Sequence, residues 1–162
     1  MKKFLMTALV ALAVVTSAFA QAKTYVIDLA DTTNGPTVMI GKNPYGPNYQ
    51  NSNPPTFNKY FSKDWPQPGD IVEVHYKFTS NVDIPGLAFM LIDPTEAAKW
   101  WTQLSDQTEV VENIKAGQVV EGVMVFKVST KPVAGLSVQL MYDDKINSKI
   151  KLEKTGVKTG RK

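Results

Sequence analysis

The chain has no cysteine and only one histidine, His75, among its 162 residues. Disulfide bonds are therefore excluded, and so is the attachment of a lipid to a cysteine. Few ligands remain for a transition-metal site. A Ser-His-Asp triad would have to use His75, and no serine motif of the nucleophile-elbow type accompanies it. The sequence thus favours a protein that is not an enzyme and has no cofactor.

Long apolar runs are also absent, apart from one near the amino terminus. Residues 1–20 begin with Met-Lys-Lys, continue with an apolar run from Phe4 to Val15 and end with Thr-Ser-Ala-Phe-Ala. This order is typical of a secretory signal peptide cleaved after Ala20, and the run is shorter than a membrane-spanning helix of about 20 residues. We expect 142 residues (162 − 20) to remain as one soluble domain, either periplasmic or secreted.

A strong net charge is lacking. Without Lys2 and Lys3 the formal charge falls from +3 to +1, which gives no overall field for a polyanion. Residues 145–162, however, hold seven Lys or Arg against one acid, Glu153. This segment is either a solvated final strand with a frayed end or, over residues 154–162, a basic tail that docks on an acidic surface. No aromatic residues alternate with its lysines, so nucleic-acid binding is not expected.

Helical periodicity is nearly absent, whereas alternation with a period of two is frequent. The clearest example is residues 71–78, where apolar and polar side chains alternate as in a strand with one buried face. Residues 86–92 are apolar at nearly every position, which predicts a central strand covered on both faces. Further strands are expected at residues 24–29, 119–129, 136–142 and 150–152. The predicted fold is all-β, a two-sheet antiparallel β-sandwich (jelly roll) over residues 21–153.

The segments between the predicted strands have sequence patterns that predict turns and loops. Turn-forming residues between 131 and 135 predict a hairpin that joins strands 119–129 and 136–142, and Gly122 is expected to mark a bulge. Residues 31–55, rich in Asn, Gly and Pro, predict a long loop with one strand-like part at 37–40. The helical candidate is the short segment 94–101.

Residues 65–74 read Trp-Pro-Gln-Pro-Gly-Asp-Ile-Val-Glu-Val, a Pro-Gly-Asp turn that leads into an alternating strand. This pattern resembles the corresponding turn in jelly-roll carbohydrate-binding modules of the galactose-binding-like superfamily. Similar features continue through residues 86–93, 100–105, 123–128 and 136–142. The resemblance implies two antiparallel sheets packed face to face, with sugar held on a concave sheet face or by loops at one end.

Sugar binding requires flat aromatic side chains for stacking and polar side chains for hydrogen bonds. Trp100 and Trp101 are adjacent, so in an extended chain they point to opposite sides and one is expected to be an accessible stacking platform. The alternative is that one fills the core while the other covers a sheet edge. The hydrogen-bonding candidates are His75, Gln103 and Gln139. If their strands share a sheet, the polar face around His75 would adjoin Gln139; otherwise that face is simply solvated.

Other candidates have two interpretations each. Trp65 either binds ligand or plugs one end of the sandwich, and Tyr45 and Tyr49 either line a groove or pin the long loop to the body. Asp143 and Asp144 follow a predicted strand, where they form a solvated turn or contribute to a structural calcium site, which the resembled superfamily often has.

Taken together, these residues predict a non-catalytic extracytoplasmic binding module for carbohydrate. The alternative is a structural or assembly protein of the cell envelope that binds another protein, because no catalytic domain accompanies the sandwich.

Overall fold

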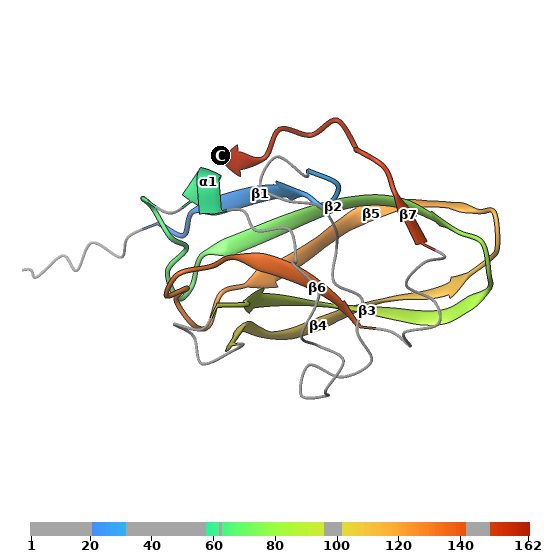
Figure 1. Ribbon diagram of the computed structural model, residues 1–162. Helices are drawn as coiled ribbons and strands as arrows, with labels where there is room; N and C mark the ends of the chain where they lie inside the picture. Colours follow the sequence, from blue (N-terminus) through green and yellow to red (C-terminus); the bar gives the residue numbers. More distant parts are fainter. Residues whose placement is uncertain (1–20, 32–57, 62, 96–101, 142–149) are drawn as a thin grey trace, which may run out of the picture.

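The computed structural model describes residues 21–31, 58–61, 63–95, 102–141 and 150–162. Their elements are, in chain order, β1 (Thr24–Asp28), α1 (Asn58–Phe61), β2 (Ile71–Ser80), β3 (Ile84–Asp93), β4 (Thr102–Ile114), β5 (Val119–Lys127), β6 (Ser137–Met141), β7 (Ile150–Leu152) and β8 (Gly160–Arg161). The strands form two sheets packed face to face, so the predicted all-β sandwich is confirmed (Figure 1). In the described part of the chain no helix has the length and apolar character needed to span a membrane.

The larger sheet is built around β2. One edge of β2 pairs antiparallel with β5 from Ile71 to Thr79, and its other edge pairs with β1 and then with β7. The strand order is β5-β2-β1-β8, and the smaller sheet has the order β4-β3-β6. The β1–β2 pair is parallel, an exception to the antiparallel arrangement that the sequence predicts.

The core lies between the sheets because the alternating strands turn their apolar sides inward. Val72, Val74 and Phe78 of β2 are fully buried, as their spacing predicts. The predicted central strand is confirmed as β3, in which residues 89–93 are all buried. The largest buried side chains of the core are Tyr25, Phe61, Phe78, Phe89 and Phe126.

The predicted hairpin between residues 119–129 and 136–142 is wrong. β5 pairs with β2 in the larger sheet, whereas β6 pairs with β3 in the smaller one. The connection from β5 to β6 therefore crosses between the sheets. Asp93 at the end of β3 holds this crossing, since its Oδ2 accepts hydrogen bonds from the N–H groups of Val133 and Ala134 at 2.7 and 3.0 Å.

Four further expectations concern single segments of the chain. The register between β2 and β5 continues without a shift past Gly122, so the predicted bulge is absent from this strand pair. Pro94 and Thr95 are not helical, and the rest of the helical candidate lies outside the described residues. The predicted signal peptide and all but residue 31 of the long loop also lie outside them.

The carboxyl-terminal residues return to the sheet and are not frayed. After β7, residues 153–159 run beside the larger sheet, and β8 pairs antiparallel with β1, with Tyr25 opposite Arg161 (Figure 1). The Lys162 N–H also donates to the carbonyl of Thr24 at 2.9 Å. This order was not evident in the sequence because β8 has only two residues and neither is apolar.

Candidate functional site

Asp28, at the end of β1, organises the carboxyl-terminal segment. Its side chain is 3% exposed and accepts hydrogen bonds from the Ala30 N–H at 3.1 Å and from both the N–H and the hydroxyl of Thr155 at 2.9 Å. The Asp28 N–H in turn donates to Thr159 Oγ1 at 3.1 Å. Because a buried carboxylate needs such donors, these bonds fix residues 155–159 against β1.

Beside Asp28 the surface is hollowed into an open pocket of about 370 Å³, which we name the C-terminal pocket. Three parts of the chain, β1 with its end, α1 and the carboxyl-terminal segment, supply its lining. The lining residues are Asp28, Asp31, Tyr60, Lys154, Gly156, Val157, Lys158 and Thr159.

Tyr60 supplies the aromatic surface of this pocket. Its hydroxyl donates a hydrogen bond to Asp31 Oδ2 at 2.8 Å, and the residue is 36% exposed. Its ring lies 6.1 Å from that of Phe61, which is buried and packs edge-on against Tyr25 at 5.3 Å. The core therefore fixes α1, and α1 positions Tyr60.

The chemistry of the C-terminal pocket suits a small polar ligand. Its lining combines one aromatic residue, Tyr60, with the acidic Asp31 and two exposed lysines, Lys154 and Lys158. A ring can stack on the C–H face of a ligand while charged groups form strong hydrogen bonds to its hydroxyl or anionic groups. No histidine is among the described lining residues.

Within the described ranges, no group of three His, Cys, Asp or Glu side chains is placed to hold a metal ion. The calcium candidates Asp143 and Asp144 lie outside the described residues, as do Trp100, Trp101, Tyr45 and Tyr49.

The condition for a polar surface shared by His75 and Gln139, that their strands lie in one sheet, is not met. His75 is on β2 in the larger sheet and Gln139 is on β6 in the smaller sheet, where it is fully buried. His75 Nε2 instead lies 3.7 Å from Glu73 Oε2, and Glu73 also accepts a hydrogen bond from Lys162. Gln103, on β4, is partly buried.

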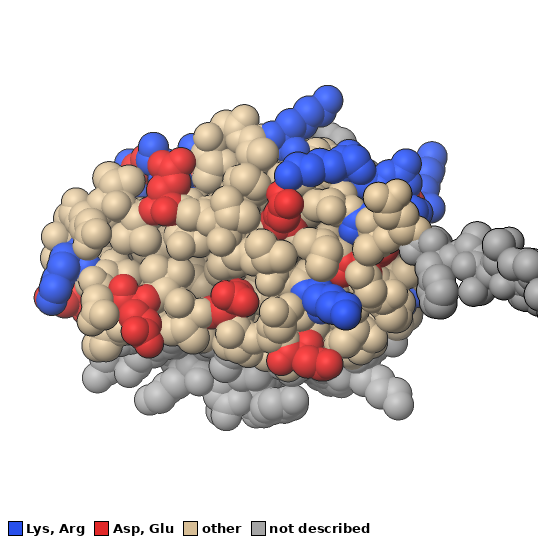
Figure 2. Space-filling model, turned by 180° about the vertical axis from the view of Figure 1, so that it is seen from behind, with Lys and Arg blue, Asp and Glu red and all other residues tan. Residues whose placement is uncertain are grey.

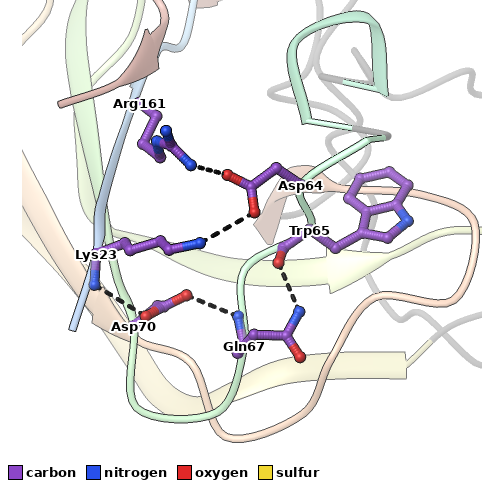
Figure 3. A network of polar contacts seen from close by, with 6 residues as sticks. All are labelled: Lys23, Asp64, Trp65, Gln67, Asp70 and Arg161. Carbon is purple, nitrogen blue, oxygen red and sulfur yellow. Dashed lines mark hydrogen bonds and ion pairs between the residues drawn. The ribbon is translucent and has the colours of Figure 1, made fainter. Parts of the chain in front are cut away.

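Trp65 is only partly exposed and packs against the core, which fits its structural interpretation. Figure 3 shows its indole pointing away from a network of polar contacts that surrounds the Pro-Gly-Asp turn. In that network Asp70 Oδ2 accepts a hydrogen bond from the Gln67 N–H at 2.8 Å, and its Oδ1 accepts one from the Lys23 N–H at 2.9 Å. Asp70 thereby ties the turn to the start of β1.

The turn itself follows from its residues. The Asp70 N–H donates to the Gln67 carbonyl at 2.9 Å, and Gly69 has a φ of 98°. Proline at the second position and a left-handed glycine at the third are the signature of a type II turn. Nearby, Asp64 accepts hydrogen bonds from Lys23 and Arg161, which joins the turn region to both β1 and β8 (Figure 3).

A second hollow of about 330 Å³ lies between β4 and the end of β5. It is lined by Asp106, Gln107, Lys127, Val128 and Ser129. Direct hydrogen bonds already join several of these residues, including Gln107 Oε1 with the Lys127 N–H at 2.7 Å and Ser129 Oγ with Asp106 Oδ1 at 3.0 Å. Since its polar groups pair with one another, it is a weaker candidate than the C-terminal pocket.

Comparison with known proteins does not assign the chain to a family. No protein-family model, no curated protein and no solved structure matches the chain significantly.

Proposed function

We propose that the protein is a non-catalytic binding module that acts outside the cytoplasm and binds carbohydrate in the C-terminal pocket. The observation that carries the proposal is the position of Tyr60, whose ring borders a pocket of about 370 Å³ together with Asp31 and two lysines. Pyranose rings present a C–H face that stacks on an aromatic ring and hydroxyl groups that bind charged side chains.

Two features of the sequence support the same function. The amino-terminal residues have the pattern of an export signal, and the Pro-Gly-Asp turn with its following strand resembles carbohydrate-binding modules of the galactose-binding-like superfamily. The sandwich is the architecture that this resemblance implies, although an architecture alone does not determine a ligand. Trp100 or Trp101 stays a proposed second stacking platform.

The direct test is calorimetric titration of the purified protein with a panel of neutral and acidic glycans. Tyr60→Ala should weaken binding by about tenfold or more, because it removes the stacking surface. Tyr60→Phe keeps the ring and loses only the hydroxyl that binds Asp31, so it should retain most of the affinity. Absence of binding to every glycan in the panel would overturn the proposal.

Matched lysine variants separate the pocket from general charge effects. Lys158→Ala should weaken the binding of acidic glycans, whereas Lys115→Ala, at an exposed lysine beside the β4–β5 turn, should not. Equal losses of affinity in both variants would show that acidic glycans are attracted by the general positive charge of the protein. Trp100→Ala and Trp101→Ala, followed by fluorescence, test the second platform independently.

The alternative function, an envelope protein that binds another protein, is favoured by the basic carboxyl-terminal surface. Side chains of Lys151, Arg161 and Lys162 are 52–78% exposed on backbone held by the sheet. Figure 2 shows Lys and Arg side chains gathered along the upper edge of one face of the molecule. Deleting residues 154–162 would remove β8, so Lys→Gln changes at Lys151, Lys154 and Lys158 are the cleaner test in a pull-down from envelope extracts. Unchanged partner recovery would exclude Lys151, Lys154 and Lys158 from partner binding.

A further inference from the structure

Among the described strands β5 is an edge strand, and its outer side is unpaired from Val119 to Val125, whereas the Lys127 N–H is bonded to Gln107 of β4. β5 lies at the end of the larger sheet and pairs with β2 alone among the described strands. The Val128 N–H donates to the Asp70 carbonyl, so even-numbered residues of this strand direct their main-chain groups toward β2. The N–H and C=O groups of Val123 and Val125 consequently point away from the sheet.

Over the described residues, this edge has neither a proline nor a bulge to hinder strand pairing. Natural edge strands are blunted by prolines, bulges or closely spaced lysines. β5 has no proline, its register with β2 is continuous, and Val119, Val123 and Val125 are 55%, 49% and 46% exposed. A long, regular edge with half-exposed valines favours a strand partner.

The charges of β5 are arranged so that the strand complements itself. Glu121, Val123, Val125 and Lys127 lie on the outer face of the sheet in that order. If a second copy of β5 runs antiparallel with Met124 opposite Met124, each glutamate faces a lysine and each Val123 faces a Val125. All four of these residues are odd-numbered, so the outward main-chain groups of Val123 and Val125 meet as complete hydrogen-bonded pairs, and the Glu121 N–H meets the Lys127 carbonyl.

Existing contacts are compatible with this arrangement. Glu121 lies 3.6 Å from Lys77 on the neighbouring strand and its side chain is still 54% exposed, so it can face a second cation. The Lys127 N–H is already bonded to Gln107, which leaves the N–H groups of residues 121, 123 and 125 as the donors of the new pairing.

We propose that two copies of the protein associate through antiparallel pairing of β5 with β5, about a two-fold axis at Met124. Such a contact is isologous, because the same surface serves both copies and the assembly closes as a dimer. The larger sheets of the two copies then form one continuous sheet. This inference is independent of carbohydrate binding, since the C-terminal pocket lies on other elements.

The test is a charge exchange followed by analytical ultracentrifugation of the purified protein up to about 1 mM. Glu121→Lys places two lysine pairs across the interface and Lys127→Glu places two glutamate pairs there. Each single variant should raise the dimer dissociation constant by about tenfold or more. An equimolar mixture of the two variants restores both opposite-charge pairs and should dimerise as well as the wild type. Circular dichroism and thermal unfolding of each variant check that its fold is intact.

The absence of native cysteine permits a second readout. Val123→Cys mixed with Val125→Cys should yield a disulfide between the two different variants, because directly opposite residues are within bridging distance. Either variant alone should cross-link poorly. A monomeric wild type at every concentration, a dimer indifferent to both charge reversals, or a mixture that fails to recover would each overturn the proposal.

Discussion

Tyr76 on β2 lies directly over Gly122 on β5, so closely that a methyl group on the glycine would come within 2.5 Å of the tyrosine hydroxyl. The Tyr76 ring is held there by stacking on Phe89 at 5.8 Å and by a tilted contact with Phe78. The glycine is therefore explained by the space that the aromatic ring occupies, with no interruption of the strand.

Gly122→Ala is expected to destabilise the protein by about 1–3 kcal/mol, because Tyr76 can yield only by leaving its stacked position. Chemical denaturation measures the loss. Gly160→Ala is the matched control, since a methyl group there meets nothing within 4 Å and the expected change is within about 0.5 kcal/mol. Equal effects of the two substitutions would contradict the packing explanation.

Tyr25→Phe should stabilise the protein at neutral pH by about 1 kcal/mol. The Tyr25 hydroxyl is buried without a hydrogen-bond partner among the described residues, and phenylalanine keeps the edge-on contact with Phe61. The free energy of unfolding from urea titration is the measurement. A clear loss of stability would mean that the hydroxyl has a partner.

The same residue predicts alkaline sensitivity. Burial, reinforced by the charges of Asp64 and Asp70, raises the pKa of Tyr25 from 10.0 to about 12. The pKa of Tyr25 is higher in the folded protein than in the unfolded chain. The stability that the neutral Tyr25 hydroxyl contributes is therefore fully present below pH 10 and is lost as the pH rises toward 12. Urea midpoints of the wild type should fall more steeply than those of Tyr25→Phe in this window.

Acid should weaken the contacts of the carboxyl-terminal strand. A hydrogen bond from Lys162 lowers the pKa of Glu73 below its usual value, and one from Lys23 lowers that of Asp64. Folded carboxylates with depressed pKa values stabilise the protein above about pH 4.5, and this contribution is lost as the pH falls through the folded values. Glu73→Gln should reduce the slope of the urea midpoint against pH between about 5 and 3. An unchanged slope would show that Glu73 does not contribute to the loss of stability in acid.

Asp93→Ala should lower the free energy of unfolding by on the order of 3 kcal/mol or more. Its fully buried carboxylate accepts four hydrogen bonds, from Thr95 N–H and hydroxyl and from the N–H groups of Val133 and Ala134. Asp83 is the control, because it also accepts main-chain and side-chain hydrogen bonds but is exposed to solvent, so Asp83→Ala should cost much less. Comparable losses in thermal unfolding would contradict the role assigned to burial.

Strands with one buried face could be predicted from the sequence, because burial imposes the alternation. This applies to β2, β5 and β7, and the continuous apolar run similarly identifies β3, whereas β1 is buried at four of its five residues. By contrast, β4 was missed. Its sequence is mostly polar and most of its side chains are at least partly exposed, so only Leu104, Ser105 and Ile114 are buried and no alternation marks the strand.

Strand pairing was harder to predict than strand position. Residues 119–129 and 136–142 both alternate and are separated by turn-forming residues, which locally is indistinguishable from a hairpin. The deciding contacts come from elsewhere in the chain, namely β2, β3 and the buried Asp93. Hydrogen bonds between segments far apart in the chain cannot be predicted from the local pattern of residues.

The C-terminal pocket could not be predicted from the sequence for the same reason. The sequence singled out tryptophans and strand-borne polar residues, whereas the pocket joins Asp31, Tyr60 and the carboxyl-terminal segment, which are far apart in the chain. A usable signal was the aspartate that ends β1, since an acidic residue buried beside an apolar strand requires donors. The threonines at 155 and 159 supply such partners.

The pairing of β1 with both β2 and β8 has a consequence for folding kinetics. β1 is made early, yet its parallel neighbour follows more than forty residues later and its other neighbour only at residues 160–161. Such nonlocal pairings require large loops to close first, which slows folding relative to hairpin-built sheets. During synthesis, Tyr25 and Ile27 are covered only after β2 and β8 have been made, so the nascent chain exposes an apolar segment that is prone to aggregate in the meantime.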